Sequence, residues 1–531
     1  MQSYALTVDK FLDHAAKWSG AREIVTARGG RIGYAALRTR SNRLSGALAV
    51  LGLKAGDRVG TLAWNTQHHL EIYYAVMGAG MVCHTLNPRI TAAQLAAMVN
   101  EAEDRVLAVA ANLWPLLAEV APLCPGLEHV ILLDGDAPTD DGLGDHPATV
   151  WTLEGLLTAH GAEAVWGAFP EETPAGLCYT SGTTGRPKGV VYTHRSNYLH
   201  TLRGLQADAF ALTARDVVLV AVPMFHANAW GLPFAAPAAG AKLVLPGRQA
   251  DGESLARLMR EEGVTVAVGV QTVWLGVLDH LEATGGALPA LERVVIGGSH
   301  CPDALIQRME TGLDALVQTS WGMTELSPLG VVTARDAPRT ETRAAGRPMM
   351  GLDLKLTDAD GVTLPQQRGV VGHLKVKGPS VLDRYFKAEA DSLDPEGYFD
   401  TGDLARIDAD GSLTICGRSK DLIKSGGEWI NPTEIEAIVG RHPTVAQVAV
   451  IGRADRKWDE RPVLIVEPRQ GQAVDARGLI AALKGQVPDW WLPDQVARIA
   501  AMPLAATGKI DKVRLRADYV DGKIPVEEVA R

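Results

Sequence analysis

Short apolar runs alternate with amphipathic stretches over most of the chain. Val59–Ala63, Val217–Val222 and Val264–Val270 are continuous apolar runs that predict buried strands, whereas Ser254–Glu262 has the spacing of an amphipathic helix. Strands that alternate with helices predict an α/β fold with a mainly parallel sheet and helices on both of its faces. From residue 351 to about 412 the pattern becomes alternating and rich in turns, which predicts a small β-barrel-like subdomain.

Length and composition narrow the class of protein. The chain has 531 residues, which is too long for one core and allows two to four folding units. Its 47% hydrophobic and 21% charged residues are ordinary for a globular protein. The net charge of −10 argues against a nucleic-acid partner held by a general basic surface, although it leaves room for a local basic tunnel that binds a phosphorylated ligand.

The cysteines and the apolar segments bear on the compartment. Five scattered cysteines show neither a C-x-x-C pair nor zinc-ligand spacing, which is typical of a reduced, cytoplasmic protein. The N-terminus has no signal-peptide pattern. The segment 217–241 has no charged residue, but it contains three prolines and also His226 and Asn228, so we expect a buried strand and loop and no integral membrane segment.

The segment Tyr179-Thr-Ser-Gly-Thr-Thr-Gly-Arg-Pro-Lys-Gly-Val190 combines hydroxyls, glycines and two cations. Glycines let a backbone turn tightly, and the N–H groups and hydroxyls of such a turn form a concavity that suits an anion. Arg186 and Lys188 add positive charge beside it. The spacing fits neither a Walker A element nor a G-x-G-x-x-G fingerprint. We therefore predict an unusual phosphate-binding loop.

Several other candidate residues have a structural explanation as well as a functional one when they are considered singly. His226 follows the apolar run that begins at Val217, at the end of a strand where open α/β sheets bind ligands, but an isolated histidine is usually structural. Gly297-Gly298 ends another apolar run, and such pairs usually only mark tight turns. Trp321 fits plain core packing equally well, and a lone lysine such as Lys509 is ordinarily solvated.

Five motifs resemble, in order, those of the adenylate-forming superfamily, which comprises acyl-CoA synthetases, peptide-synthetase adenylation domains and firefly-type luciferases. The segment 179–190 is similar almost letter for letter. The others are Ser320-Trp-Gly-Met-Thr-Glu325, Gly397-Tyr-Phe-Asp-Thr-Gly-Asp403, Gly417–Glu436 and Thr507-Gly-Lys509. The last motif departs slightly, because Leu504 and Ala505 replace a more usual basic and hydroxyl pair. The resemblance covers essentially the whole chain.

The resemblance implies a two-domain architecture. Residues 1–419 would form a large adenylating domain of two packed mixed or parallel sheets with flanking helices, together with the β-barrel-like subdomain at about 351–412. Residues 420–531 would form a small, mobile α+β domain that carries the catalytic Lys509. Lys420 would be the hinge between the two domains.

The resemblance also implies residue roles at a nucleotide site. Lys509, Thr324, Glu325 and His226 would be catalytic, with Thr324 on the α-phosphate and Glu325 on Mg²⁺, which prefers carboxylate and phosphate oxygens. Asp403 would accept hydrogen bonds from the ribose hydroxyls. The implied ATP- and AMP-binding set is Thr180, Ser181, Gly182, Thr183, Thr184, Gly185, Lys188, Gly297, Gly298, Ser299, Trp321, Gly322, Met323, Thr324, Asp403 and Arg418.

Two further sets follow from the same resemblance. The acyl pocket would consist of His226, Trp230, Trp321 and Gly322, and two tryptophans there favour short-to-medium acids. His226 stands where peptide-synthetase domains typically have an aspartate for the amino group, which argues against an amino-acid substrate. The CoA side would be formed by Lys424, Gly426, Gly427, Glu428, Trp429 and Glu460, with Trp458 near the same channel.

The implied reaction joins a carboxylic acid to CoA at the expense of ATP. The acid and ATP would give acyl-AMP and pyrophosphate, and CoA would then give the thioester and AMP. Within the family, the chain looks most like the bacterial medium- and long-chain acyl-CoA ligases, a branch that includes the methylmercaptopropionate-CoA ligases. Two alternatives stay open: a luciferase-like oxidase and a ligase that charges a carrier protein. A binding protein without catalysis would be expected to lose Lys509 or Glu325, and both are present. The oligomeric state is also open, with a homodimer as one alternative.

Overall fold

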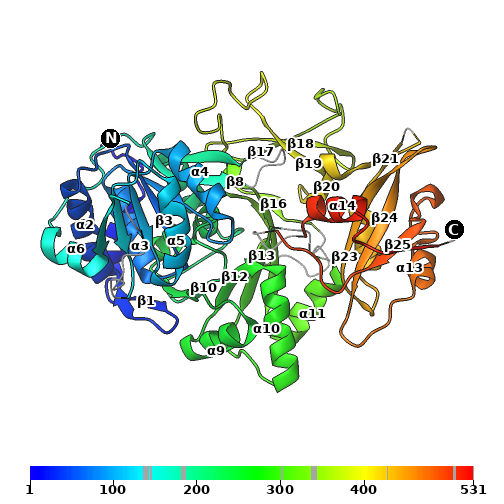
Figure 1. Ribbon diagram of the computed structural model, residues 1–531, viewed down its shortest axis with the longest axis horizontal. Helices are drawn as coiled ribbons and strands as arrows, with labels where there is room; N and C mark the ends of the chain where they lie inside the picture. The colour runs from blue at the N-terminus through cyan, green and yellow to red at the C-terminus, as the bar shows by residue number, and fades with distance from the viewer. Residues whose placement is uncertain are drawn as a thin grey trace.

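The structure is a computed structural model of the chain, and it describes residues 1–135, 143, 146–180, 187–298, 301, 303–336, 344–426, 428–505 and 510–529. These residues form four sheets with helices around them. Figure 1 shows β3 of the seven-stranded sheet on one side and the C-terminal unit on the other, with β12 and β13 of the nine-stranded sheet and the third sheet between them. None of the helices in the described ranges has the length and apolarity that crossing a membrane requires.

The seven-stranded sheet has the order β7-β6-β5-β3-β4-β8-β9 and is parallel except for the last pair. Its inner strands, such as β4 and β5, are buried on both faces, as expected for a parallel sheet covered by helices. The strands of this sheet are β3 (Arg58–Leu62), β4 (Val82–Thr85), β5 (Val106–Val109), β6 (His129–Leu132), β7 (Thr149–Thr152), β8 (Pro174–Thr180) and β9 (Lys188–Thr193).

The nine-stranded sheet has the order β16-β15-β14-β13-β12-β10-β11-β1-β2, parallel in its centre and antiparallel at both edges. The carboxyl ends of its central parallel strands β10, β13 and β14 lead into His226, Gly297-Gly298 and the 320–325 motif. The strands are β1 (Glu23–Thr26), β2 (Arg31–Gly33), β10 (Val217–Val220), β11 (Lys242–Leu245), β12 (Val266–Val270), β13 (Arg293–Gly297), β14 (Leu316–Gly322), β15 (Leu329–Val332) and β16 (Arg347–Pro348).

One hydrophobic core joins these two sheets. This core contains residues of both sheets, for example Val59 of β3 and Val218 of β10. It also contains Tyr73 and Phe234, whose ring centres are 6.5 Å apart. The helices are α1 (Asp9–Trp18), α2 (Tyr34–Val50), α3 (Gln67–Gly78), α4 (Ala92–Ala102), α5 (Trp114–Val120), α6 (Leu153–His160), α7 (His194–Gly204), α8 (Leu232–Ala239), α9 (Gly252–Glu262), α10 (Gln271–Thr284) and α11 (Asp303–Leu313).

The third sheet is antiparallel, with the order β17-β18-β19-β20. Its strands are β17 (Asp353–Thr357), β18 (Val371–Lys377), β19 (Phe399–Ile407) and β20 (Leu413–Arg418). The expected turn-rich subdomain is present, but within the described residues its sheet is open, with β17 and β20 as edges, and is not a closed barrel. The sheet also extends beyond the expected limit of about residue 412, because β20 covers Leu413–Arg418.

The C-terminal unit has a sheet of the order β22-β21-β24-β25-β26, with β23 paired to β24. It has its own apolar cores, one of which contains Ile423, Ile435 and Leu479. Its strands are β21 (Ile423–Ser425), β22 (Glu428–Ile430), β23 (Val445–Asp455), β24 (Asp459–Pro468), β25 (Gln495–Arg498) and β26 (Val526–Glu528), and its helices are α12 (Pro432–Val439), α13 (Ala476–Leu483) and α14 (Lys512–Val520).

Polar contacts join the C-terminal unit to the rest of the chain. The amide of Asn431, which caps α12, donates to the carbonyl of Cys416 in β20 at 2.6 Å. At the other end of α12, Arg441 lies 3.9 Å from Asp303 at the start of α11. Figure 1 draws α14 on the side of this unit nearer β20, and α13 on the farther side.

Candidate active site

The predicted phosphate loop connects β8 to β9, which pair antiparallel so that Thr180 lies opposite Lys188. The central residues Ser181, Gly182, Thr183, Thr184 and Gly185, with Arg186, lie outside the described residues. The described flanks still fix where the loop begins and ends. The Lys188 ammonium lies 4.8 Å from the ring centre of Tyr385, over its aromatic face.

Thr324 and Glu325 lie in the short helix η4 (Thr324–Leu326), which directly follows β14. Both are buried. Tyr192 donates to the carbonyl of Thr324 at 2.9 Å, and Tyr385 donates to Glu325 Oε1 at 2.9 Å. Burial raises the pKa of the Glu325 carboxyl, while the Tyr385 hydrogen bond and the charges of Arg418 and Lys188 oppose that rise.

This carboxylate fits magnesium only together with a nucleotide. Among the described residues, no group of three or more His, Cys, Asp or Glu side chains gathers closely enough to hold a metal ion. A single carboxylate with phosphate oxygens is a common arrangement for Mg²⁺ in sites that transfer phosphoryl or nucleotidyl groups. Glu325 therefore suits MgATP as a substrate rather than a resident metal ion.

Asp403 connects the predicted ribose site with the predicted acyl pocket. Its Oδ2 accepts from the indole N–H of Trp321 at 2.9 Å, and its Oδ1 lies 2.8 Å from Nε of Arg418. Asp403 and Arg418 face each other across β19 and β20, so the sheet register sets this ion pair. Arg418 also donates to the carbonyl of Thr401 at 3.1 Å. The arrangement joins three predicted nucleotide-site residues in one network.

The acyl-pocket motif forms a left-handed turn after β10. Ala227, Asn228, Ala229 and Trp230 all have positive φ, between 45° and 57°, and Gly231 follows at 80°. Each non-glycine residue in this region costs about 1–2 kcal/mol, so the surrounding contacts must hold the turn in place. The Ala227 N–H bonds the Cys178 sulfur at 3.3 Å, which ties the turn to β8.

A second anchor precedes the turn. The Asn65 side chain donates to the carbonyls of Val220 and Val222 at 2.8 Å, and it accepts from Met224 N at 2.7 Å. His226, half-buried, then opens the turn, and its backbone N–H donates to Pro223 O at 3.1 Å.

The turn brings Trp230 against the predicted adenine-side turn. A methyl group added at Gly297 would lie 2.9 Å from the Trp230 ring and 2.4 Å from Ser320 Oγ. Only glycine fits there, and Gly298 has φ +86°, which also favours glycine. Gly322 is equally constrained, because an added methyl would lie 2.2 Å from the Pro328 carbonyl. Ser299 lies outside the described residues.

The predicted CoA residues gather at one end of the C-terminal sheet. The Lys424 N–H donates to Glu460 Oε2 at 2.9 Å, and the Gly426 N–H donates to the Trp458 carbonyl at 2.8 Å. Glu428 and Trp429 begin β22, which pairs with β21, and both are exposed. Gly427 and Lys509 lie outside the described residues.

Lys420, the predicted hinge, lies between β20 of the third sheet and β21 of the C-terminal sheet. Just before it, the Ser419 hydroxyl lies 3.1 Å from His373 Nδ1 of β18. Just after it, Asp421 accepts from Arg516 of α14 at 2.6 Å. Lys420 thus lies between a contact to the third sheet and a contact to α14.

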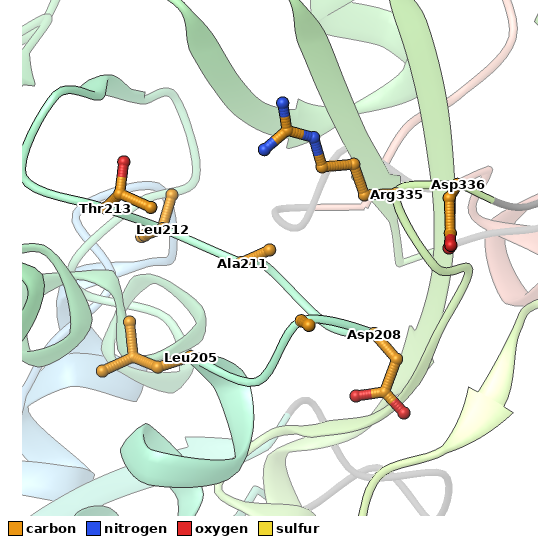
Figure 2. A pocket seen from close by; sticks show the side chains of 8 residues that line it. Leu205, Asp208, Ala211, Leu212, Thr213, Arg335 and Asp336 are labelled. Carbon is orange, nitrogen blue, oxygen red and sulfur yellow. The ribbon is translucent and has the colours of Figure 1, made fainter.

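Two contacts have no counterpart in the sequence predictions. Tyr385 and Tyr192 contact Glu325 and Thr324, yet neither tyrosine belongs to a motif used above. A separate hollow of about 650 Å³, part of whose lining is seen in Figure 2, is lined by Leu205, Ala207, Asp208, Ala211, Leu212, Thr213, Arg335 and Asp336. None of the predicted site residues lines it, so it is distinct from the candidate site.

Comparisons with known proteins identify the class. The AMP-binding enzyme family matches residues 11–386, and its C-terminal domain matches residues 434–509. The chain therefore belongs to the AMP-binding enzyme family. A 3-methylmercaptopropionyl-CoA ligase of Ruegeria lacuscaerulensis is 42% identical over 98% of each chain. A medium-chain-fatty-acid–CoA ligase of Ectopseudomonas oleovorans is 39% identical over 98% of this chain and 97% of its own.

A solved structure agrees with these relatives. ATP-bound MatB from Rhodopseudomonas palustris has a TM-score of 0.84 and 26% identity, covering 98% of this chain and 99% of that one. The predicted family, the α/β fold class and the enzyme class, an AMP-forming acid–thiol ligase that uses ATP, Mg²⁺ and CoA, are confirmed. The domain limits and the residue roles stay predictions.

Proposed function

We propose that this chain activates a short-to-medium-chain carboxylic acid, with 3-(methylthio)propionate among the candidates, and transfers it to CoA. The observation that carries this proposal is the pair of indoles at the nucleotide site. Trp230 packs against Gly297, and Trp321 is held by Asp403, so bulky rings flank the place where acid and nucleotide would meet. The names of the two relatives, which act on a thioether acid and on medium-chain acids, support the same size range.

In the first half-reaction, the chain's own residues would bind MgATP and hold it for attack by the acid. Asp403 would accept from the ribose hydroxyls, Lys188 would attract the phosphates, and Glu325 would meet the metal-bound phosphates. Lys509 would neutralise the charge that develops between carboxylate and α-phosphate, which is where fixed cations contribute most. No protein nucleophile is required for this step.

In the second half-reaction, Lys509 would withdraw and the Gly426 turn would bring CoA to the acyl-AMP. This exchange calls for rotation of residues 420–531 against residues 1–419. The tethers on either side of Lys420, at Ser419 and Asp421, support this boundary.

The described cysteines form no disulfide bond, which suits the cytoplasm, the compartment that we propose.

The substrate range is tested by CoA-dependent AMP release across a panel of carboxylic acids. We expect the highest kcat/KM for acids between propionate and octanoate in size, 3-(methylthio)propionate included, because the two indoles shorten the pocket. Faster use of palmitate than of these acids would contradict the proposal. Parallel assays with a holo-carrier protein and with an oxygen electrode separate CoA ligation from carrier charging and from a luciferase-like oxidation.

The hinge is tested by Lys420→Pro. Proline fixes φ and restricts the residue before it, so it stiffens the crossing between the two units. We expect thioester formation from supplied acyl-AMP to slow markedly, while acyl-AMP formation, measured as pyrophosphate exchange, is largely retained. A matched Lys420→Ala variant, which keeps backbone freedom, should leave both steps near wild type. Unchanged thioester kinetics in the proline variant would count against the hinge.

A further inference from the structure

Tyr385 lies at the candidate phosphate site and contacts one residue from each of the two large sheets. Its hydroxyl donates to Glu325 Oε1 at 2.9 Å, and the Lys188 ammonium lies 4.8 Å from the centre of its ring. Glu325 follows β14 of the nine-stranded sheet, whereas Lys188 begins β9 of the seven-stranded sheet. One half-buried side chain thus contacts the carboxylate assigned to MgATP and the lysine assigned to its phosphates.

The segment that carries Tyr385 is fixed at both ends. We name residues 382–386 the strap. At its start, the Leu382 N–H donates to the carbonyl of Glu325 at 2.8 Å, and at its end the Phe386 N–H donates to the carbonyl of Gly189 at 2.8 Å. Phe386 packs so closely on Gly189 that an added methyl group there would lie 2.9 Å from its Cβ. The backbone on either side of Tyr385 is therefore held against both neighbours of the site.

These contacts suit a role in presenting charge to a ligand. The phenol hydroxyl occupies one oxygen of the Glu325 carboxylate, which fixes the rotation of that group and leaves its other oxygen to a further partner. A lysine held over an aromatic face is attracted by the ring without being neutralised by an anion, so the Lys188 charge stays available to a phosphate. Both effects come from the same ring and its hydroxyl.

We propose that Tyr385 is a positioning residue for MgATP, which orients the Glu325 carboxylate toward the metal-bound phosphates and holds Lys188 beside them. The inference rests on the proposed function, because that function assigns both partners of Tyr385 to MgATP. The proposed role of Tyr385 predicts different effects on the affinities of two ligands of the same site, MgATP and AMP. AMP lacks the β- and γ-phosphates that bring Mg²⁺, so its affinity depends on Asp403 and not on Tyr385.

The experiment is isothermal titration of the whole protein with the magnesium complex of α,β-methylene-ATP and, separately, with AMP. Tyr385→Phe keeps the ring over Lys188 and removes only the hydroxyl. We expect its Kd for the magnesium complex to rise about tenfold, the size typical of a lost hydrogen bond to a charged group, with little change for AMP. Tyr385→Leu, which also loses the ring, should weaken the magnesium complex further.

The chain offers a matched control in the same small sheet region. Tyr398 donates its hydroxyl to Asp353 at 2.6 Å and also carries a lysine, Lys355, over its ring. Tyr398→Phe should leave both affinities unchanged. If Tyr385→Phe behaves like this control, or weakens AMP and the magnesium complex equally, the positioning role is wrong.

A double variant tests whether Tyr385 acts through Glu325. In a Glu325→Gln background, Tyr385→Phe should cause little further loss of affinity for the magnesium complex, and full additivity would overturn the proposal. Failure of the proposed site assignment gives a different result: Glu325→Gln alone would then leave the affinity for the magnesium complex at its wild-type value. The two failures are therefore distinguishable in one set of titrations.

Discussion

Lys509→Ala is expected to abolish most acyl-AMP formation and to spare most thioester formation from supplied acyl-AMP. Removing a cation or donor aimed at charge that develops in the transition state typically costs about 10²–10³ in rate, and only the first half-reaction has such charge at the α-phosphate. The measurements are pyrophosphate exchange for the first step and CoA-dependent release of AMP from synthetic acyl-AMP for the second.

The flanks of Lys509 make this assignment testable without a change in the fold. Leu504 and Ile510 pair on either side of it, and Asp511 caps α14 by accepting from the Arg514 N–H. The control is Lys523→Ala, an exposed lysine just beyond α14, which should leave both steps unchanged. If the Lys509 variant lost both half-reactions equally, the assignment of Lys509 to acyl-AMP formation alone would be wrong.

Asp403→Ala is expected to reduce kcat/KM for ATP at least about a hundredfold. Hydrogen bonds to a charged group contribute about 1.5–3 kcal/mol each, and the variant loses the acceptor for two ribose hydroxyls. The same change removes the partner that holds the Trp321 indole and the Arg418 guanidinium. Initial rates at varied ATP and at varied acid measure the two effects separately.

The ATP effect should exceed the effect on the acid, since the acid loses only the fixed orientation of Trp321. Asp360→Ala, at an exposed turn of the same small region, is the control and should change neither constant. A Tm close to that of the wild type confirms that the variant is folded. A loss confined to the acid, with ATP kinetics unchanged, would contradict the assignment of Asp403 to the ribose.

The sequence alone predicts the architecture because its apolar runs are unambiguous. β10 and β12 fall within the runs that begin at Val217 and Val264, β3 begins one residue before the run at Val59, and α9 follows the amphipathic spacing of residues 254–262. The α/β class follows from this alternation, and the family resemblance supplies the site residues. The open form of the third sheet could not be predicted from the sequence, because strand alternation alone does not show whether the two edge strands pair with each other.

Other features of the site depend on tertiary contacts that no local pattern encodes. The left-handed turn at Ala227–Trp230 includes two alanines and a tryptophan, residues that disfavour positive φ, and contacts from Asn65 and Cys178 hold it. Tyr385 comes from a turn-rich segment without a motif, so its approach to Glu325 appears only when the sheets are packed together.

The independent cores of the C-terminal unit bear on the energetics of turnover. Because Ile423, Ile435 and Leu479 are buried within that unit, a swivel about Lys420 exposes none of them. The contacts that it would break include the Arg441–Asp303 pair and the bond from Asn431 to β20, and water can replace both. Exposed ion pairs contribute at most about 1 kcal/mol, so breaking these contacts would cost little free energy beside what a bound ligand contributes.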